Sequence, residues 1–355
     1  AVHIDITPSH FTTATQQWKL YSRGIDIDST RISVKELHIA RPDQQMVIDG
    51  DFPTVVSPNP ENPEGFYLAV ELADKEGADF ILGSDPDADR VGIMVNTGNG
   101  EFKVLSGNQI GILLVDYTIG AWKRAGKLPA NGTILKSLVS TEMARAIAEA
   151  NGLKCFDTFT GFKFLAQKKD QLEESGDGTV LMAFEESNGY MFGSFVRDKD
   201  AVTAALVLTE MAAWYADQGM TLYDALMALY EKYGYYGEKT LNLVMPGLDG
   251  LKKMAQLMAD LRAKPPVEIA GVAVKEQKDY KDGSVVCVEC GCKSTMELTG
   301  SNVLRYEMAD GTSLIVRPSG TEPKVKVYIL TYAESEEERN ANIAKYAAWA
   351  ETLKG

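Results

Sequence analysis

Three aspartates at alternate positions, Asp85, Asp87 and Asp89, form the motif with the clearest chemistry in this sequence. They lie in the run SDPDADR, directly after the apolar segment ADFILG. A turn lets side chains at i, i+2 and i+4 converge on one hard cation, and Mg²⁺ takes such oxygen ligands while leaving positions for a phosphate oxygen. A solvated acidic turn is the alternative. An EF-hand loop starting at Asp85 is excluded, because Arg90 and Asn96 stand where glycine and glutamate are required.

A second run, RPSGTEPK at 317–324, follows the apolar strand SLIVR. It combines two cations, two hydroxyls and a glycine that exposes backbone N–H groups, which are the groups that bind a phosphate monoester. An ordinary turn with a surface arginine and lysine is the alternative. The candidate phosphate-binding residues are Arg317, Ser319, Gly320, Thr321 and Lys324.

Three further runs place polar groups at the ends of predicted elements. FEESNGY at 184–190 ends a strand and offers carboxylates that suit sugar hydroxyls, and TGFK at 160–163 opens a helix, whose N-terminus attracts anions. RDKD at 197–200 is the third, and a helix cap or a solvated face is the alternative for each. The candidate residues here are Thr160, Gly161, Lys163, Glu185, Ser187 and Lys199.

The elements that must position these runs alternate between strand and helix from about residue 50 to 235. This alternation favours parallel α/β domains, in which ligands sit at the carboxyl ends of strands. Asn62 and Pro63 predict a helix start and Gly77 its end. The segment 240–330 reads as strands with turns, including Pro246-Gly247, and a helix capped by Ser335 covers about 335–353.

Length and composition limit the class of protein. The chain has 355 residues, enough for two to four domains, of which 45% are hydrophobic and 24% charged. The net charge of −14 argues against a general nucleic-acid binder. No apolar run is long enough to span a bilayer, no signal peptide is evident, and three of four cysteines (287, 290 and 292) lie close together. We therefore expect no nucleic acid, no membrane, a reduced cytoplasmic compartment, and cysteines buried alternately in a strand rather than a zinc site.

Together, the runs resemble the α-D-phosphohexomutase superfamily of phosphoglucomutases and phosphomannomutases over roughly residues 46–355. The segment GDFPTVVSPNPENPE at 50–64 also looks like the family, and FEESNGY and VRDKDA look most like bacterial phosphoglucomutases. The resemblance implies a multidomain α/β enzyme with parallel or mixed sheets and a C-terminal α+β domain. Its parts would be a remnant of a phosphoserine domain at 1–45, a metal-binding domain at 46–128, a sugar-binding domain at 129–240 and a phosphate-binding domain at 245–355.

The resemblance also assigns roles to residues. Asp85, Asp87 and Asp89 would hold Mg²⁺. Glu185 and Ser187 would bind sugar hydroxyls near Thr160 and Gly161, the run at 317–324 would hold the non-reacting phosphate, and cations would surround the transferring group. Those cations are Arg90, Lys163 and Lys199.

The family transfers a phosphoryl group from a phosphoserine to the sugar, passes through glucose 1,6-bisphosphate and returns the other phosphate. The run TPSH makes Ser9 the candidate phosphoserine and His10 its neighbour, although a chance match is the alternative. The histidines are His3, His10 and His38, so no histidine base comes from the sugar-binding domain. Lys199 is the candidate base, with a pKa lowered by cationic surroundings, and a salt bridge to Asp198 or Asp200 is the alternative.

The expected activity is that of a phosphoglucomutase, acting on a hexose phosphate. Phosphomannomutase or phosphopentomutase activity, or an inactive sugar-phosphate-binding fragment without the phosphoserine domain, are the alternatives. A metal-dependent phosphatase ranks last, because such an enzyme usually carries its nucleophilic aspartate on an N-terminal strand. The sequence does not indicate an oligomeric state.

Overall fold

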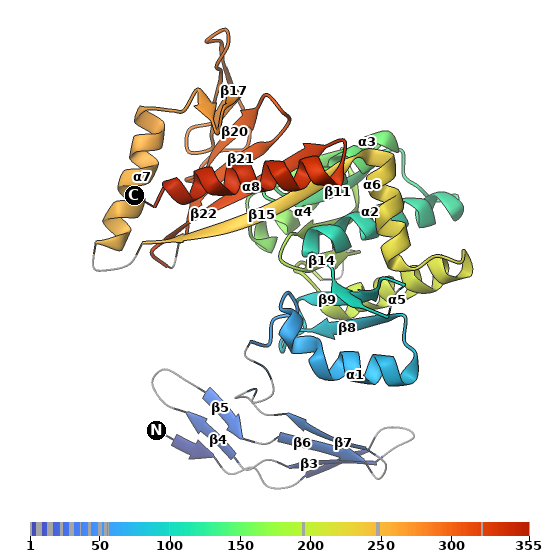
Figure 1. Cartoon of the computed structure of the whole chain (residues 1–355). Coiled ribbons are helices and arrows are strands. Elements are labelled where there is room, and N and C mark those ends of the chain that lie inside the picture. Colours follow the sequence, from blue (N-terminus) through green and yellow to red (C-terminus); the bar gives the residue numbers. More distant parts are fainter. Residues whose placement is uncertain are drawn as a thin grey trace. The chain divides into compact units, whose positions relative to one another are not determined.

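The computed structural model describes residues 57–354 except 99, 194–195, 246–248 and 321, together with Phe52, Val55 and the backbone of strands between Val2 and Ile48. The chain divides into two compact units, Ala1–Leu72 and Ala73–Gly355 (Figure 1). None of the described helices combines the length and the apolar character needed to cross a bilayer.

The first unit contains short antiparallel strands in two sheets, with the orders β1-β4-β5 and β2-β3-β6-β7. A 3₁₀ turn, η1 (Pro63–Phe66), leads into helix α1 (Tyr67–Glu76). The predicted start at Pro63 and end at Gly77, with φ +68°, are confirmed, but Asn62 makes no side-chain cap. The strands are β1 (Val2–Ile4), β2 (Ser9–Thr12), β3 (Gln17–Tyr21), β4 (Gly24–Ile27), β5 (Ile32–Lys35), β6 (Leu37–Arg41) and β7 (Gln44–Ile48).

The aspartate run connects two strands of a small antiparallel sheet with the order β10-β9-β8. Its strands are β8 (Phe80–Ser84), β9 (Val91–Asn96) and β10 (Phe102–Val104). The expectation of a parallel arrangement is wrong here, because the short loop at 85–90 closes a hairpin and is too short for the crossover that parallel strands require.

A mixed sheet with helices on both faces follows. Strands β11 (Gly132–Ser137), β12 (Lys154–Thr158) and β13 (Thr179–Glu185) are parallel, and β14 (Gly189–Phe192) pairs antiparallel with β13. One face packs Leu135 and Ala183 against α4 (Phe162–Ser175), while the other packs Ile134 and Phe184 into a larger core. That core also includes residues of α2 (Gly107–Arg124), α3 (Met143–Ala150), α5 (Ala201–Asp217) and α6 (Leu222–Tyr233).

The C-terminal domain is an antiparallel sheet with the order β15-β22-β21-β20-β17-β18-β19, and β16 pairs with β17. Helix α8 (Glu336–Thr352) packs Tyr346 and Ala350 against it, and the Ser335 Oγ accepts the Glu338 N–H as predicted. The strands are β15 (Tyr235–Val244), β16 (Glu268–Ile269), β17 (Val272–Asp279), β18 (Ser284–Cys287), β19 (Lys293–Thr295), β20 (Leu304–Met308), β21 (Ser313–Pro318) and β22 (Lys324–Ala333).

Two expectations for this domain are wrong. The segment 240–330 contains a helix, α7 (Gly250–Ala263), on which Met254, Leu257, Met258 and Leu261 recur at helical spacing and pack on the domain core. The cysteines do not alternate along a strand either. Cys287 ends β18, whereas the cysteines at 290 and 292 are exposed in the turn that follows.

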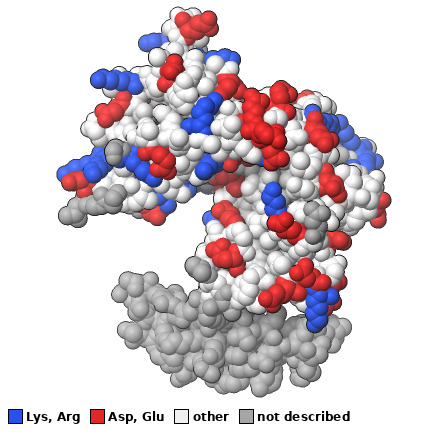
Figure 2. Space-filling view, viewed as in Figure 1, with Lys and Arg blue, Asp and Glu red and all other residues white. Residues whose placement is uncertain are grey.

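Acidic and basic side chains are interspersed on the face of the described residues that Figure 2 shows. In this view the C-terminal domain carries both acidic and basic side chains, and so does the domain that contains β11–β14 and its helices. The negative net charge of the chain therefore does not produce a single acidic face in this view.

The packing of α2 on β13 predicts the effect of an added methyl group at Gly111. A Cβ there would lie 2.5 Å from Cε2 of Phe184. We expect Gly111→Ala to lower the free energy of unfolding in urea by about 1–3 kcal/mol, because overpacking exceeds the ~1 kcal/mol that alanine gains in a helix.

Gly120→Ala is the matched control in the same helix. The nearest atom to its added Cβ is the terminal Nη1 of Arg124, at 3.0 Å, which can move away. We expect this variant to gain up to about 1 kcal/mol. Equal losses at both positions would contradict the role given to Phe184.

Candidate functional site

The aspartate loop brings three carboxylates together at the end of β8. One oxygen from each of Asp85, Asp87 and Asp89 lies within 4.8 Å of the others, and no second group of this kind occurs among the described residues. The loop is shaped by its own backbone: Asp85 Oδ1 accepts the N–H groups of Asp89 and Arg90, each at 3.0 Å. Ala88 takes φ +56°, which turns the chain back toward β9.

The electrostatics of this loop favour a bound cation. Burial raises the pKa of Asp85, the backbone N–H of Arg90 opposes this, and the neighbouring carboxylates of Asp89 and Asp87 raise it further. Asp89 Oδ1 is buried and has no hydrogen-bond partner among the described residues. A hard divalent cation with oxygen ligands would relieve both features, so these residues fit Mg²⁺.

Two cations also approach the aspartate loop. Lys199 Nζ lies 2.5 Å from Asp89 Oδ2 and 3.5 Å from Asp198 Oδ1, and Arg90 Nε lies 3.6 Å from Asp89 Oδ1. The expected lowering of the Lys199 pKa is wrong. Burial does lower it, but the hydrogen bond to Asp89 and the charge of Asp198 raise it by more. The alternative of a salt bridge to Asp198 is confirmed, with Asp89 as the closer partner.

The FEESNGY run forms the turn between β13 and β14. Glu185, the last residue of β13, is buried, and its Oε1 accepts the Gly161 N–H at 2.5 Å. Burial, with the neighbouring charge of Glu186, raises the pKa of Glu185 to about 7. Ser187 lies half-buried in the turn itself. The turn thus presents a carboxyl group that can accept or donate a hydrogen bond near neutral pH.

The helix-start run lies beside this turn. Gly161 precedes α4 with φ +119°, and the buried Thr160 Oγ1 has no hydrogen-bond partner among the described residues. Lys163 is exposed, with its Nζ 4.9 Å from the centre of the Phe164 ring. The structure therefore brings Thr160 and Gly161 to the turn between β13 and β14, which we call the sugar turn after the role expected from the sequence, while the Lys163 side chain packs on an aromatic ring.

The RPSGTEPK run joins β21 to β22. The Ser319 N–H donates to the Lys324 carbonyl at 2.8 Å, and the Ser319 Oγ accepts the Glu322 N–H at 3.3 Å. Lys324 Nζ lies 2.5 Å from Glu322 Oε2, and Arg317 Nη1 donates to the Tyr328 hydroxyl at 3.5 Å. Gly320 is open to solvent, and Thr321 lies outside the described residues.

Backbone hydrogen bonds, and the charge of Arg317, link these runs in space although they are far apart in the sequence. The Val91 N–H, directly after the aspartate loop, donates to the Asn188 carbonyl in the sugar turn at 3.1 Å. The Ala201 N–H at the start of α5 donates to the Ala88 carbonyl at 3.0 Å. The charge of Arg317 acts on Glu185 and lowers its pKa, against the larger effect of burial. The side chains of Ser9 and His10 lie outside the described residues.

Sequence reasoning missed residues that shape the sugar turn. Asn188 adopts φ +62° and is fully buried, and Glu186 Oε2 accepts the Ser137 hydroxyl at 2.9 Å. A Cβ at Gly107 would lie 2.1 Å from the Glu186 carbonyl, so only glycine allows α2 to approach the turn this closely. The Asn-Gly pair at 188–189 was a usable turn signal, whereas nothing local in the sequence marks Gly107.

Three family models match consecutive parts of the chain. They describe phosphoglucomutase/phosphomannomutase alpha/beta/alpha domain II at residues 33–98, alpha/beta/alpha domain III at 106–233 and the C-terminal domain at 242–345. The chain belongs to the phosphoglucomutase/phosphomannomutase family. The aspartate loop falls in the domain II match and the sugar turn in the domain III match. The RPSGTEPK run at 317–324, which we call the phosphate loop after its expected role, falls in the C-terminal match.

Curated relatives within the phosphoglucomutase/phosphomannomutase family are named phosphoglucomutase. That of Staphylococcus aureus strain N315 is 38% identical over 287 residues, which is 81% of this chain and 51% of the relative. That of strain MRSA252 is 37% identical over 281 residues, which is 79% of this chain and 50% of the relative. The chain thus spans about half the length of the curated relatives it matches.

Solved structures share the fold at low sequence identity. A phosphoglucomutase/phosphomannomutase family protein from Burkholderia thailandensis has a TM-score of 0.56 and 18% identity over 86% of this chain and 54% of its own. The Paramecium exocytosis-sensitive phosphoprotein parafusin, in an open form, has a TM-score of 0.55 and 17% identity over 84% of this chain and 50% of its own. These likenesses establish the family fold of the chain.

The environment of Glu185 predicts a pH-dependent stability. Its folded pKa of about 7 lies above the usual value, so the folded state binds more protons and stability falls as pH rises from about 4.5 to 7. We expect Glu185→Gln to remove this loss, which is at most about 3 kcal/mol. Urea unfolding of both proteins at pH 5 and pH 7.5 measures it, and a wild type and variant with equal pH dependence would overturn the assignment.

Proposed function

We propose that this chain carries the metal-, sugar- and phosphate-binding parts of a phosphoglucomutase, which interconverts glucose 1-phosphate and glucose 6-phosphate. The observation that carries the proposal is the backbone hydrogen bond to Asn188 in the sugar turn from Val91, the residue directly after the aspartate loop. The charge of Arg317, in the phosphate loop, also acts on Glu185. The curated relatives at 37–38% identity support glucose phosphate as the substrate.

The proposed roles follow from the geometry of each loop. Asp85, Asp87 and Asp89 would hold Mg²⁺, which when bound neutralises negative charge on the transferring phosphoryl group. Arg90 and Lys199 would add positive charge beside it. Lys199 would donate a hydrogen bond to an oxygen of that group rather than act as a base, since its Nζ already lies beside the carboxylates of Asp89 and Asp198.

The sugar and the distal phosphate would be bound by the other two loops. Glu185 and Ser187 would orient sugar hydroxyls, with Thr160 and Gly161 beside them, and Lys163 would add charge at the rim. The non-reacting phosphate would be bound in the loop after β21, by charge-assisted hydrogen bonds and an exposed backbone N–H. The residues proposed for it are Arg317, Ser319, Gly320, Thr321 and Lys324.

The complete reaction needs a phosphoryl donor. In the proposed cycle a sugar hydroxyl attacks the phosphorus of a phosphoserine, the serine oxygen leaves and takes up the proton that the sugar hydroxyl loses, and glucose 1,6-bisphosphate forms. The serine hydroxyl then attacks the other phosphate in the same way and takes it back. Ser9, with His10 beside it, is the proposed donor in this chain. Incubation with glucose 1,6-bisphosphate and Mg²⁺, followed by phosphopeptide mapping, tests it. One phosphate on Ser9 is expected, and binding of the sugar phosphate without any phosphoserine would make the chain a binding part only.

Removal of one aspartate tests the metal site. We expect Asp87→Asn to weaken Mg²⁺ binding at least tenfold in titration calorimetry, because a charged oxygen ligand is lost from a hard cation. Asp79→Asn, an exposed aspartate beside β8, is the control and should bind as the wild type does. Equal Mg²⁺ affinity in all three proteins would reject the aspartate loop as the site.

Removal of one arginine tests the phosphate loop. We expect Arg317→Met to weaken glucose 6-phosphate binding at least tenfold, since a charge-assisted bond to the phosphate is lost. Lys239→Met removes an exposed cation from β15 and should leave the affinity unchanged. If both variants lose affinity equally, the effect is one of general charge and the assignment of Arg317 fails.

A further inference from the structure

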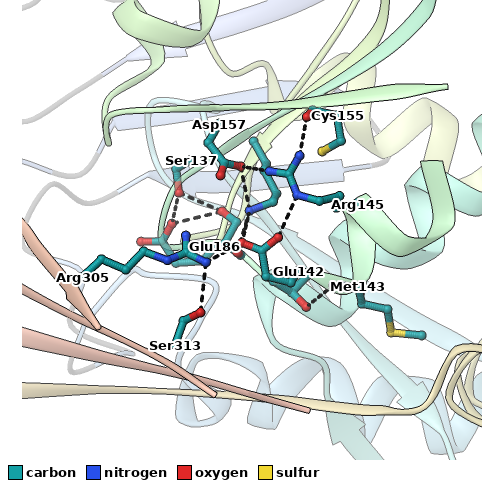
Figure 3. A network of polar contacts seen from close by, with 12 residues as sticks. Ser137, Glu142, Met143, Arg145, Cys155, Asp157, Glu186, Arg305 and Ser313 are labelled. Carbon is teal, nitrogen blue, oxygen red and sulfur yellow. Dashed lines mark hydrogen bonds and ion pairs between the residues drawn. The ribbon is translucent and has the colours of Figure 1, made fainter. Parts of the chain in front are cut away.

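A group of ion pairs, built around two buried cations and partly buried carboxylates, lies where the sheet of β11–β14 meets the C-terminal sheet (Figure 3). At their centre Lys136, in β11, has a side chain with no exposed surface. Its Nζ lies 2.9 Å from Asp157 Oδ1 and 3.2 Å from Glu142 Oε1. Arg145 contacts the same two carboxylates, at 2.7 Å and 3.0 Å. These four residues all belong to the sugar-binding domain.

One arginine crosses from the C-terminal sheet into this group. Arg305, in β20, places Nη2 3.2 Å from Glu142 Oε1, and its side chain is 8% exposed. Its Nε lies 2.7 Å from Glu307 Oε1, and its Nη2 also donates to the Ser313 hydroxyl at 3.0 Å. Glu142 is therefore shared between cations of both domains, which ties β20 to the start of α3.

The same group continues to the sugar turn. Lys136 Nζ donates to the Ser140 carbonyl at 3.2 Å, and the hydroxyls of Ser140 and Ser137 lie 2.8 Å apart. The Ser137 hydroxyl donates to Glu186 at 2.9 Å, and Glu186 adjoins the sugar-turn carboxylate Glu185. A continuous run of polar contacts thus joins the C-terminal sheet to the sugar turn.

Apolar contacts also join the two domains, so attraction between the domains does not depend on the ion pairs alone. Leu138 and Phe159 of the sugar-binding domain cluster with Tyr280 and Ile315 of the C-terminal domain. Hydrophobic attraction is non-directional, so this cluster favours contact between the domains, whereas ion pairs and hydrogen bonds add directional contacts. Burying ions is costly, and the best-attested gain from doing so is a defined geometry rather than stability.

The charge state of the shared carboxylate is secure. Burial alone would raise the pKa of Glu142, but Lys136, Arg305 and Arg145 together hold it well below its usual value. Glu142 is therefore ionised at any pH near neutral, and the contact with Arg305 is a charged one.

We propose that Glu142 and Arg305 are positioning residues that fix the C-terminal domain, and with it the phosphate loop at 317–324, at one distance from the sugar turn. This inference rests on the proposed function, in which a sugar phosphate contacts both loops at once. A ligand that spans the two domains depends on their relative position, whereas a ligand bound by the phosphate loop alone does not.

The test compares a spanning ligand with a local one on the full chain. We expect Arg305→Met to weaken glucose 6-phosphate binding about tenfold, a coupling of ordinary size for groups in one network, and to leave inorganic phosphate binding unchanged. Both are measured by calorimetry without metal, so that phosphate cannot bind at the aspartate loop through a cation. Arg305→Lys, which keeps one charged contact, should recover part of the loss.

Lys278→Met is the matched control. Lys278 Nζ contacts Glu276 at 2.9 Å and Glu307 Oε1 at 2.8 Å, the oxygen that Arg305 Nε also contacts. Its loss therefore removes a partly buried cation from the same group of charges but keeps the contact between Arg305 and Glu142 across the boundary. We expect both affinities to stay within twofold of the wild type. If Lys278→Met loses as much glucose 6-phosphate affinity as Arg305→Met, the effect is structural and the inference is wrong.

A ligand-free measurement separates this inference from the proposed function. Amide hydrogen exchange at 138–142 and at 303–307 should be faster in Arg305→Met and in Glu142→Gln, because both sides of the boundary open more often. In Lys278→Met, exchange at 138–142, on the other side of the boundary, should be unchanged. If the wild type binds no sugar phosphate, the proposed function fails while exchange still judges the positioning role. Unchanged exchange in Glu142→Gln and Arg305→Met overturns the inference. It is also overturned if Arg305→Met loses equal affinity for glucose 6-phosphate and for inorganic phosphate together with helical circular dichroism, because the variant is then unfolded.

Discussion

Like charges gathered at one point are the constraint on which the rest of this site depends. One oxygen from each of Asp85, Asp87 and Asp89 lies within 4.8 Å of the others, and two unit negative charges at that separation repel each other by about 3.5 kcal/mol at an effective dielectric constant near 20. Local hydrogen-bond donors and a lysine distant in sequence offset this repulsion. Backbone N–H groups of the loop bind Asp85, and Lys199 comes from the far side of the sugar turn to bind Asp89. The site is thus an acidic centre set among cations, suited to a metal ion and an anionic substrate together.

The sequence predicted the parts of this structure that are determined locally. Strands followed by runs such as SDPDADR and FEESNGY were found where expected, because a buried strand and the turn after it both leave local signals. The short loop between β8 and β9 was enough to predict that they pair antiparallel. The alternation of strands and helices along the chain favoured a parallel sheet instead, and that prediction was wrong for these two strands. Helix α7 lies in a segment whose neighbouring stretches alternate apolar and polar residues, and only the spacing of Met254, Leu257, Met258 and Leu261 indicates a helix there.

What the sequence could not supply was the set of neighbours brought from a distance. Lys199 was expected among cations, but Asp89, more than a hundred positions earlier, is its nearest charged group in the folded chain. Glu142 and Arg305 belong to no sequence motif, and their role depends on the contact that the fold makes between them. Gly107 is similar, since its lack of a side chain matters only because the Glu186 carbonyl lies against it. Local sequence patterns identify the reactive groups, whereas tertiary contacts determine their charge state and orientation.

The path of β15 has a consequence for how the chain is made. This strand follows directly on α6 and pairs along its whole length with β22, from Tyr235 opposite Ala333 to Val244 opposite Lys324. Its partner leaves the ribosome about 80 residues later, roughly 4–16 s at ordinary rates of synthesis. During that interval the domain that contains β11–β14 can close its core, but β15 has no partner strand on either edge. The nascent chain therefore carries an open β-strand that a chaperone, or a second nascent chain, can reach before β22 does.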